Sequence, residues 1–347
     1  MKLLPCAIVA VALTTPAAAQ WLDYRTPGIP RTANGAPNLA APAPRTRDGK
    51  PDFTGVWRKA SLKAAAGLKA KESWVGDLVR ERRENLNKDD MGIQCLPLGP
   101  RYSTTRGNDP NIGMQKFVQA PGLLMVLNPD LTYRQIYMDG RPLESDPNPA
   151  WMGYSVGRWD GDTLVVESAG FNDRTWLDGS YPHSEGLRMT ERYRRTDFGH
   201  MDLEVTLSDP KIYAEPWTAK IGVELVPDTE LLEYVCAENT SLRDHFVGKA
   251  SDEQRAEVKV APEVLARYAG TWFEQPPYWT ETTTGRTFEI KLVDGSLYLG
   301  QTRLIPTSDT SFSNGGWPLS FVVDARGTPT QLLDTHISGD YTFTRKK

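Results

Sequence analysis

Every second residue is apolar in long stretches of this 347-residue chain. Between positions 200 and 207 the apolar residues run from Met201 to Leu207, and charged or hydroxyl side chains stand between them. Positions 217 to 225 repeat the pattern, from Trp217 to Leu225. A period of two is typical of a β-strand that buries one face. These stretches therefore predict strands of a sheet that packs against a core.

Similar strand-like runs follow one another along most of the chain, with turn residues between them. Besides the two stretches above, they cover residues 116–119, 122–128, 132–138, 154–159, 162–168, 187–194 and 231–236. Consecutive antiparallel strands with short connections favour a sheet that curls on itself. The sequence thus predicts a mainly β fold, with an antiparallel up-and-down β-barrel or half barrel.

Changes in composition divide the chain. Residues 20–52 are rich in Pro, Ala, Arg and Asn, which indicates an extended linker or a wrap along the surface. The main β domain is expected over 53–245, with an inserted helix around 61–90, where Ala, Leu, Lys, Glu and Arg dominate. A helix-like segment then precedes shorter strands and hairpin turns. This pattern predicts a second, smaller β-barrel-like domain over 246–347.

A Gly-x-Trp motif stands at the entrance of both β regions, at residues 55–57 and 270–272. In calycin barrels such as lipocalins, this motif lies on the first strand. Its Trp closes one barrel end, and an Arg from the last strand covers the ring. Arg345 could cover Trp272 in this way by a cation–π contact. The two motifs favour calycin or lipocalin-like barrels.

The first nineteen residues predict a secretory signal peptide. One charge, on Lys2, precedes an apolar run, and the small residues that end at Ala19 form an A-x-A site, so we expect cleavage after Ala19. Thr14 to Pro16 interrupt the apolar run, which is shorter than the span of about 18 residues that a membrane anchor needs. We therefore expect a periplasmic or secreted bacterial protein with no transmembrane segment in its mature chain.

Charge and cysteine content refine this prediction. The formal net charge of −4 excludes the basic surface that nucleic-acid binding requires. Cys95 and Cys236 remain after removal of the leader. An oxidising compartment favours a disulfide between them, with two inert buried thiols as the alternative.

Residues 116–239 resemble a large, mostly uncharacterised family of exported bacterial proteins. The resemblance rests on the runs GRPLESDPNPAWMGYSVGRW, GDTLVVESAGFNDRTWLD, PHSEGLRMTERYRR, DFGHMDLEVTL and LVPDTELLEYVCAEN. It supplies domain boundaries and no established reaction. The C-terminal unit resembles, more weakly, the small lipocalin-like domain appended to some penicillin-binding-type serine hydrolases. Neither S-x-x-K nor G-x-S-x-G occurs here in a usable context, which argues against that activity.

Glu191 is the residue that most suggests chemistry. In the strand-like run 187–194 it shares a face with three apolar residues, so a barrel would point its carboxylate into an apolar interior. Burial would raise its pKa and suit it to general acid or base catalysis. The alternative is a structural ion pair with an interior arginine, either Arg134 or Arg158.

Segment 171–185 concentrates polar and aromatic side chains in a predicted loop on the sheet, where binding residues tend to gather. His183 could move a proton if Asp173 or Asp178 orients it, and ordinary turn packing is the alternative. We expect Asp173, His183 and Glu191 to exchange protons in one hollow of the larger sheet. The predicted substrate-binding residues around them are Tyr154, Arg174, Trp176, Asp178 and Glu185.

His183, Glu185 and His200 are the candidate ligands of an alternative metal site. Their spacing matches no established ligand pattern, and neither H-E-x-x-H nor C-x-x-C occurs in the sequence. A P-loop is absent, as is a G-x-G-x-x-G after a strand. We therefore expect neither a cofactor nor a metal.

These residues predict an exported enzyme that performs acid–base chemistry without a covalent nucleophile, as a hydrolase, lyase, hydratase or isomerase. Its substrate would be a small or medium organic molecule, such as a glycoside or an aromatic compound. The alternative is a noncatalytic periplasmic binder or carrier of a hydrophobic small molecule. An enzyme should show unpaired or perturbed acids beside open space, and a carrier should show a mainly apolar pocket with paired carboxylates. The sequence leaves the oligomeric state open.

Overall fold

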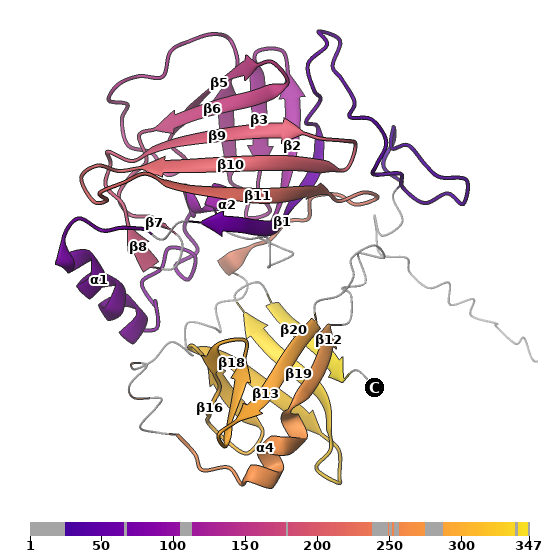
Figure 1. The fold of residues 1–347 in the computed structure, drawn as a ribbon, viewed down its shortest axis with the longest axis vertical. Helices are drawn as coiled ribbons and strands as arrows, with labels where there is room; N and C mark the ends of the chain where they lie inside the picture. The colour runs from indigo at the N-terminus through magenta and orange to yellow at the C-terminus, as the bar shows by residue number, and fades with distance from the viewer. Residues whose placement is uncertain are drawn as a thin grey trace, which may run out of the picture.

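Two nine-stranded β-sheets, each with its own hydrophobic core, contain most of the strands that the structure describes (Figure 1). The computed structural model describes residues 25–65, 68–104, 113–177, 180–237, 249, 252, 257–274, 287–336 and 339–345. The predicted signal peptide therefore lies outside the described residues. Among the residues that are described, no helix is long and apolar enough to span a membrane.

The larger sheet is a closed barrel of nine strands, in the order β1, β11, β10, β9, β6, β5, β4, β3 and β2. Their bounds are Gly55–Ala65 (β1), Met114–Ala120 (β2), Leu123–Leu127 (β3), Tyr133–Tyr137 (β4), Tyr154–Asp160 (β5), Thr163–Ala169 (β6), Arg188–Arg195 (β9), His200–Ser208 (β10) and Trp217–Leu225 (β11). The ladder between β4 and β5 is parallel, because the connection 138–153 brings the chain back beside β4 in the same direction. The predicted mainly β, barrel-forming fold class is confirmed.

The alternation of residue types decides which side chains fill this barrel. Leu203 in β10 pairs with Ile221 of β11 on one side and with Tyr193 of β9 on the other. All three side chains are buried. Asp202, the next residue along β10, is exposed on the outer face, as the period of two requires.

The first strand is longer than the sequence predicts. β1 continues to Ala65 through a run in which a helix was expected, and it pairs with β11 from Trp57 onward. β2 pairs only with Gly55 to Arg58 of this strand, so the pairing of Ser61 to Ala65 with β11 is what overrides the local helix propensity of this run. Helix α1 (Ser73–Glu84) begins only after it.

Residues 231–236 form no strand, so that prediction is wrong. A closed barrel offers no free edge to a further strand. The backbone N–H of Tyr234 instead donates to the carbonyl of Pro129 at 2.8 Å. Conversely, the segment predicted to be a loop contains a short two-stranded ladder of β7 (Trp176–Leu177) and β8 (Tyr181–Pro182).

Both Gly-x-Trp motifs adopt the same local structure. Trp57 and Trp272 are buried, and each indole Nε1 donates to the carbonyl four residues earlier, that of Phe53 at 2.8 Å and that of Tyr268 at 3.0 Å. The glycines that open the motifs have φ values of +141° and +140°, a region that favours glycine. In chain order, the two sheets therefore begin with the same local structure.

An arginine covers the first of these indoles, from β9 rather than from the last strand of the barrel. The guanidinium carbon of Arg195 lies 4.8 Å from the ring centre of Trp57. In the second sheet, Arg345 stands opposite Trp272 and donates to the carbonyl of Ala269 at 2.8 Å. A cation–π contact between Arg345 and Trp272 stays a prediction.

The second sheet has nine strands, in the order β15, β14, β13, β12, β20, β19, β18, β17 and β16. Their bounds are Gly270–Glu274 (β12), Thr287–Val293 (β13), Ser296–Leu299 (β14), Thr302–Arg303 (β15), Ile305–Pro306 (β16), Ser311–Asn314 (β17), Trp317–Val323 (β18), Pro329–His336 (β19) and Gly339–Arg345 (β20). Helix α4 (Pro262–Tyr268) precedes them and buries Leu265 and Tyr268. The short helix α2 (Arg101–Thr104) belongs to the first unit.

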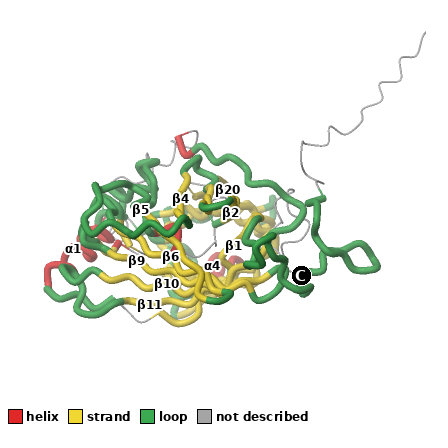
Figure 2. Tube along the Cα trace, turned by 90° about the horizontal axis from the view of Figure 1, so that it is seen from above, coloured by secondary structure: helices red, strands yellow, loops and turns green. Residues whose placement is uncertain are grey.

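The described part of the N-terminal segment, residues 25–52, is tied to the larger barrel by ion pairs. Arg31 contacts Asp228 at 2.5 Å, and Arg45 contacts Asp162 at 2.6 Å. Loops such as this one form much of the outline of the structure in the view from above, with α1 at one side (Figure 2). The segment therefore wraps along the barrel.

A disulfide joins Cys95 to Cys236, as the sequence predicts. It links the loop that follows α1 to the chain that follows β11. The connection between β1 and β2 is thereby fixed to the segment that follows the last barrel strand.

We expect no free thiol in the denatured, unreduced mature protein and two thiols after reduction. Because the bond joins positions 141 residues apart, its removal in a Cys95→Ser/Cys236→Ser variant should lower the free energy of unfolding by about 5 kcal/mol in the chain-entropy model. Urea unfolding of both proteins measures the difference. Reaction of both thiols without reductant would contradict the bond.

Candidate functional site

The described side chains inside the larger barrel pack closely and leave little open space among them. The cavity that remains around Arg134 and Tyr193 has a volume of about 10 Å³, which is room for about one water molecule. The expectation of a hollow inside the sheet, in which Glu191 meets segment 171–185, is therefore wrong. Apolar side chains from most strands and a buried polar network occupy the space.

Glu191 lies at the centre of this network and is fully buried. Arg134 Nη2 donates to its Oε2 at 2.5 Å, and the Tyr193 hydroxyl donates to its Oε1 at 2.8 Å. Burial acts to raise the pKa of Glu191, but the charge and hydrogen bonds of Arg134 outweigh it and hold the pKa below the ordinary value. The expected rise in pKa is therefore wrong, and the alternative of a structural ion pair is confirmed.

The partner in this pair is Arg134 rather than Arg158. Arg134 is also buried, and its guanidinium donates to the hydroxyls of Ser155 at 2.9 Å and Ser168 at 2.7 Å. Arg158 lies on the outer face, where its Nε is 3.9 Å from Glu167. The network thus satisfies the buried guanidinium from several strands at once.

Lys59 is a further interior charge that the sequence analysis missed. Its Nζ donates to the carbonyl of Tyr102 and, at 2.7 Å, to Gln115 Oε1. Burial lowers the pKa of Lys59 to about 8. Lys59 follows Trp57 by two positions in β1, so the strand period could have placed both side chains on the inner face.

His183 is buried beside the β7–β8 ladder. Its Nδ1 lies 3.0 Å from the carbonyl of Ser184, which can only accept, so Nδ1 carries the proton. Its Nε2 lies 2.6 Å from the Thr175 hydroxyl and accepts from it when the ring is neutral. Burial lowers the pKa of His183. Both ring nitrogens are thus used within the protein.

Three of the predicted residues, Asp173, Arg174 and Trp176, line one open cleft of about 550 Å³ against α1 and the loop after it. We call this the rim cleft. Arg82 from α1 stacks over the Trp176 ring at 4.0 Å and donates to the carbonyl of Ser180 at 2.7 Å. The Trp176 side chain is buried, so it supports the cleft from beneath.

A second cavity of about 550 Å³ lies beside the Cys95–Cys236 disulfide, and we call it the disulfide cavity. It shares Asn87 and Leu96 with the rim cleft. Its lining is mainly apolar. The aliphatic side chains include Leu86, Ile93, Leu96, Leu98, Leu131 and Val235, and Trp317 of the second sheet also contributes.

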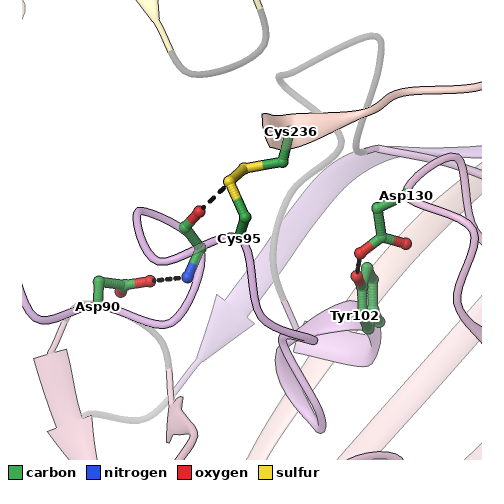
Figure 3. The surroundings of a disulfide bond; sticks show 6 residues. Asp90, Cys95, Tyr102, Asp130 and Cys236 are labelled. Carbon is green, nitrogen blue, oxygen red and sulfur yellow. Dashed lines mark hydrogen bonds between the residues drawn. A yellow bond between two sulfur atoms is a disulfide. The ribbon is translucent and has the colours of Figure 1, made fainter. Parts of the chain in front are cut away.

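The acids of the disulfide cavity have hydrogen-bond partners. Arg101 Nη1 donates to both carboxylate oxygens of Asp90, at 2.7 and 2.6 Å. Asp130 accepts from the Tyr102 hydroxyl and, at 2.7 Å, from the Thr132 hydroxyl. Figure 3 shows Asp90 close to the disulfide and the contact between Tyr102 and Asp130. Sequence reasoning missed this cavity, because its walls come from segments far apart in the chain, among them the β1–β2 connection, the β3–β4 turn and the second sheet.

The other predicted residues do not join these groups. Tyr154 and Glu185 are exposed and line neither cavity, and Asp178 lies outside the described residues. The alternative metal site is wrong, because His183 precedes β9 and His200 follows it, at opposite ends of a strand about 25 Å long. Within the described ranges, no cluster of three or more His, Cys, Asp or Glu side chains could hold a metal.

Removing one partner of the buried ion pair should be costly. We expect Glu191→Gln to lower the free energy of unfolding by about 3 to 5 kcal/mol, because it leaves the Arg134 charge uncompensated. The matched substitution Glu167→Gln, at a half-exposed site on the outer face, should change it by less than about 0.5 kcal/mol. Urea denaturation measures both, and similar losses for the two variants would contradict the pairing role.

His183 should make stability depend on pH. Because its folded pKa is lowered, the unfolded chain takes up a proton near the ordinary value of about 6.5 before the folded chain does. The contribution of His183 to the free energy of unfolding should therefore be complete above that pH and decrease as the pH drops below it. His183→Gln should flatten this slope between about pH 7.5 and 5, whereas His200→Gln should keep it. Equal slopes in wild type and His183→Gln would refute the assignment.

Comparisons with known proteins leave the chain without an assigned family. No family model matches it, and no curated protein matches it. Among solved structures, it is similar to a crystal structure of a single-residue mutant of the fluorescent protein UnaG, at 16% identity and a TM-score of 0.22. The alignment covers 49% of this chain and 94% of that one, and so low a score carries no argument about function.

Proposed function

We propose that this protein is a noncatalytic, exported binder of a hydrophobic small molecule, which it holds in the disulfide cavity. The observation that carries the proposal is the mainly apolar lining of this cavity of about 550 Å³, whose acids have hydrogen-bond partners. Small-molecule sites typically measure about 300 to 1,000 Å³ and combine an apolar wall with a few polar groups. The disulfide is compatible with export.

Acid–base catalysis has less support. Of the three predicted proton-transfer residues, Glu191 is fully buried in an ion pair, and His183 is buried with both ring nitrogens bonded. Asp173 alone is exposed beside open space, in the rim cleft. A general acid or base must reach the proton that it transfers, so two of the three residues are badly placed for the role.

Binding of an apolar fluorophore tests the proposal. We expect N-phenyl-1-naphthylamine to bind with enhanced emission, because an apolar wall removes it from water. Ile93→Asp would place a charge on that wall and should weaken binding at least tenfold, equivalent to about 1.4 kcal/mol. Fluorescence titration gives the dissociation constants.

Val258→Asp is the matched control, since Val258 is an exposed apolar residue that does not line the cavity. It should leave the affinity for the fluorophore unchanged. No binding to the wild-type protein, or equal affinities for the wild type and Ile93→Asp, would reject the disulfide cavity as the binding site.

A further inference from the structure

We infer that the disulfide cavity selects a hydrophobic organic cation, such as an amine or a quaternary ammonium compound, and that Asp130 recognises its charge. The inference rests on the proposed function and names the chemical class of the ligand. It comes from two properties of the same cavity, its apolar wall and its unbalanced charge.

The described lining of the cavity contains three charged residues, Asp90, Asp130 and Arg101. Arg101 binds Asp90 through both carboxylate oxygens, so these two charges cancel. The partners of Asp130 are neutral, namely the hydroxyls of Tyr102 and Thr132 and the backbone N–H of Thr132, and no ion pair with a described cation includes it. One negative charge on the wall is therefore left without a counter-charge from the described residues.

The partly buried position of Asp130 strengthens the effect of that charge on a ligand. Burial raises the pKa of Asp130, and hydrogen bonds from Thr132 oppose this rise. Hydroxyl groups stabilise a carboxylate without neutralising it. A cation in the cavity would supply the missing charge where the effective dielectric constant is lower than in water, which strengthens the attraction.

The rest of the wall sets the character of the ligand. Leu86, Ile93 and Leu131 offer apolar surface, and the rings of Tyr234 and Trp317 also line the cavity. Aromatic faces attract organic cations, quaternary ammonium groups in particular. An inorganic cation would leave the apolar side chains without contacts, so the geometry favours a cation that carries a hydrophobic body.

Three ligands of similar shape and different charge test the inference by displacement of N-phenyl-1-naphthylamine. They are the (naphthylmethyl)trimethylammonium cation, its neutral carbon isostere neopentylnaphthalene, and the naphthylmethanesulfonate anion. We expect the cation to bind the wild-type protein at least tenfold more tightly than the neutral isostere, and the anion to bind most weakly. Asp130→Asn should abolish this order, with each competitor's affinity calculated from the dissociation constant that the variant itself shows for the fluorophore.

Asp202→Asn, on the outer face of β10, changes the net charge equally and should keep the wild-type order. Equal affinities of the wild type for cation and isostere, or tighter binding of the anion, would overturn the inference while fluorophore binding still supports the proposed function. An unchanged preference in Asp130→Asn would overturn the role of that residue. If Asp130→Asn does not fold, the wild-type order alone decides, and absent fluorophore binding rejects both proposals.

Discussion

The ion pair between Arg134 and Glu191 controls how the inside of the larger barrel is used. A charge removed from water needs a partner and further hydrogen bonds, and here Tyr193 and two serines complete the set. These side chains come from β4, β5, β6 and β9, so the network links strands around half of the barrel. The side chains that serve as these partners occupy the barrel interior. The cavity that remains among the described residues there is too small for a ligand.

Space for a ligand therefore lies outside the strands. The loop that follows α1 and the chain that follows β11 form walls beside the barrel, and the disulfide between Cys95 and Cys236 fixes one to the other. Loops mounted on a rigid sheet commonly carry binding residues. In this protein the barrel provides the rigid support. The disulfide holds together the two segments that form the walls of the cavity beside the barrel.

Two carboxylates, the fully buried Glu191 and the half-buried Asp130, show how the groups around an acidic side chain decide its role. Glu191 faces a guanidinium, which lowers its pKa and keeps it ionised in the core. Asp130 accepts only from uncharged groups, the hydroxyls of Tyr102 and Thr132 and the Thr132 N–H, and burial raises its pKa. The first charge is matched within the protein and belongs to its architecture, whereas the second is available to a ligand. Burial acts to raise the pKa of both side chains, so the opposite directions follow from the partner, a guanidinium for Glu191 and neutral donors for Asp130.

The sequence by itself determined the elements that depend on local pattern. The period of two predicted β10 and β11, and it also pointed Glu191 inward, because the face of a strand residue follows from its position alone. Two cysteines in a chain with a predicted signal peptide predicted their bond. Only the tertiary structure chose Arg134 over Arg158, extended β1 to Ala65 and left residues 231–236 out of the sheet. Those outcomes depend on which strands lie side by side around a closed barrel, and contacts between residues far apart in the chain leave no periodic signal in it.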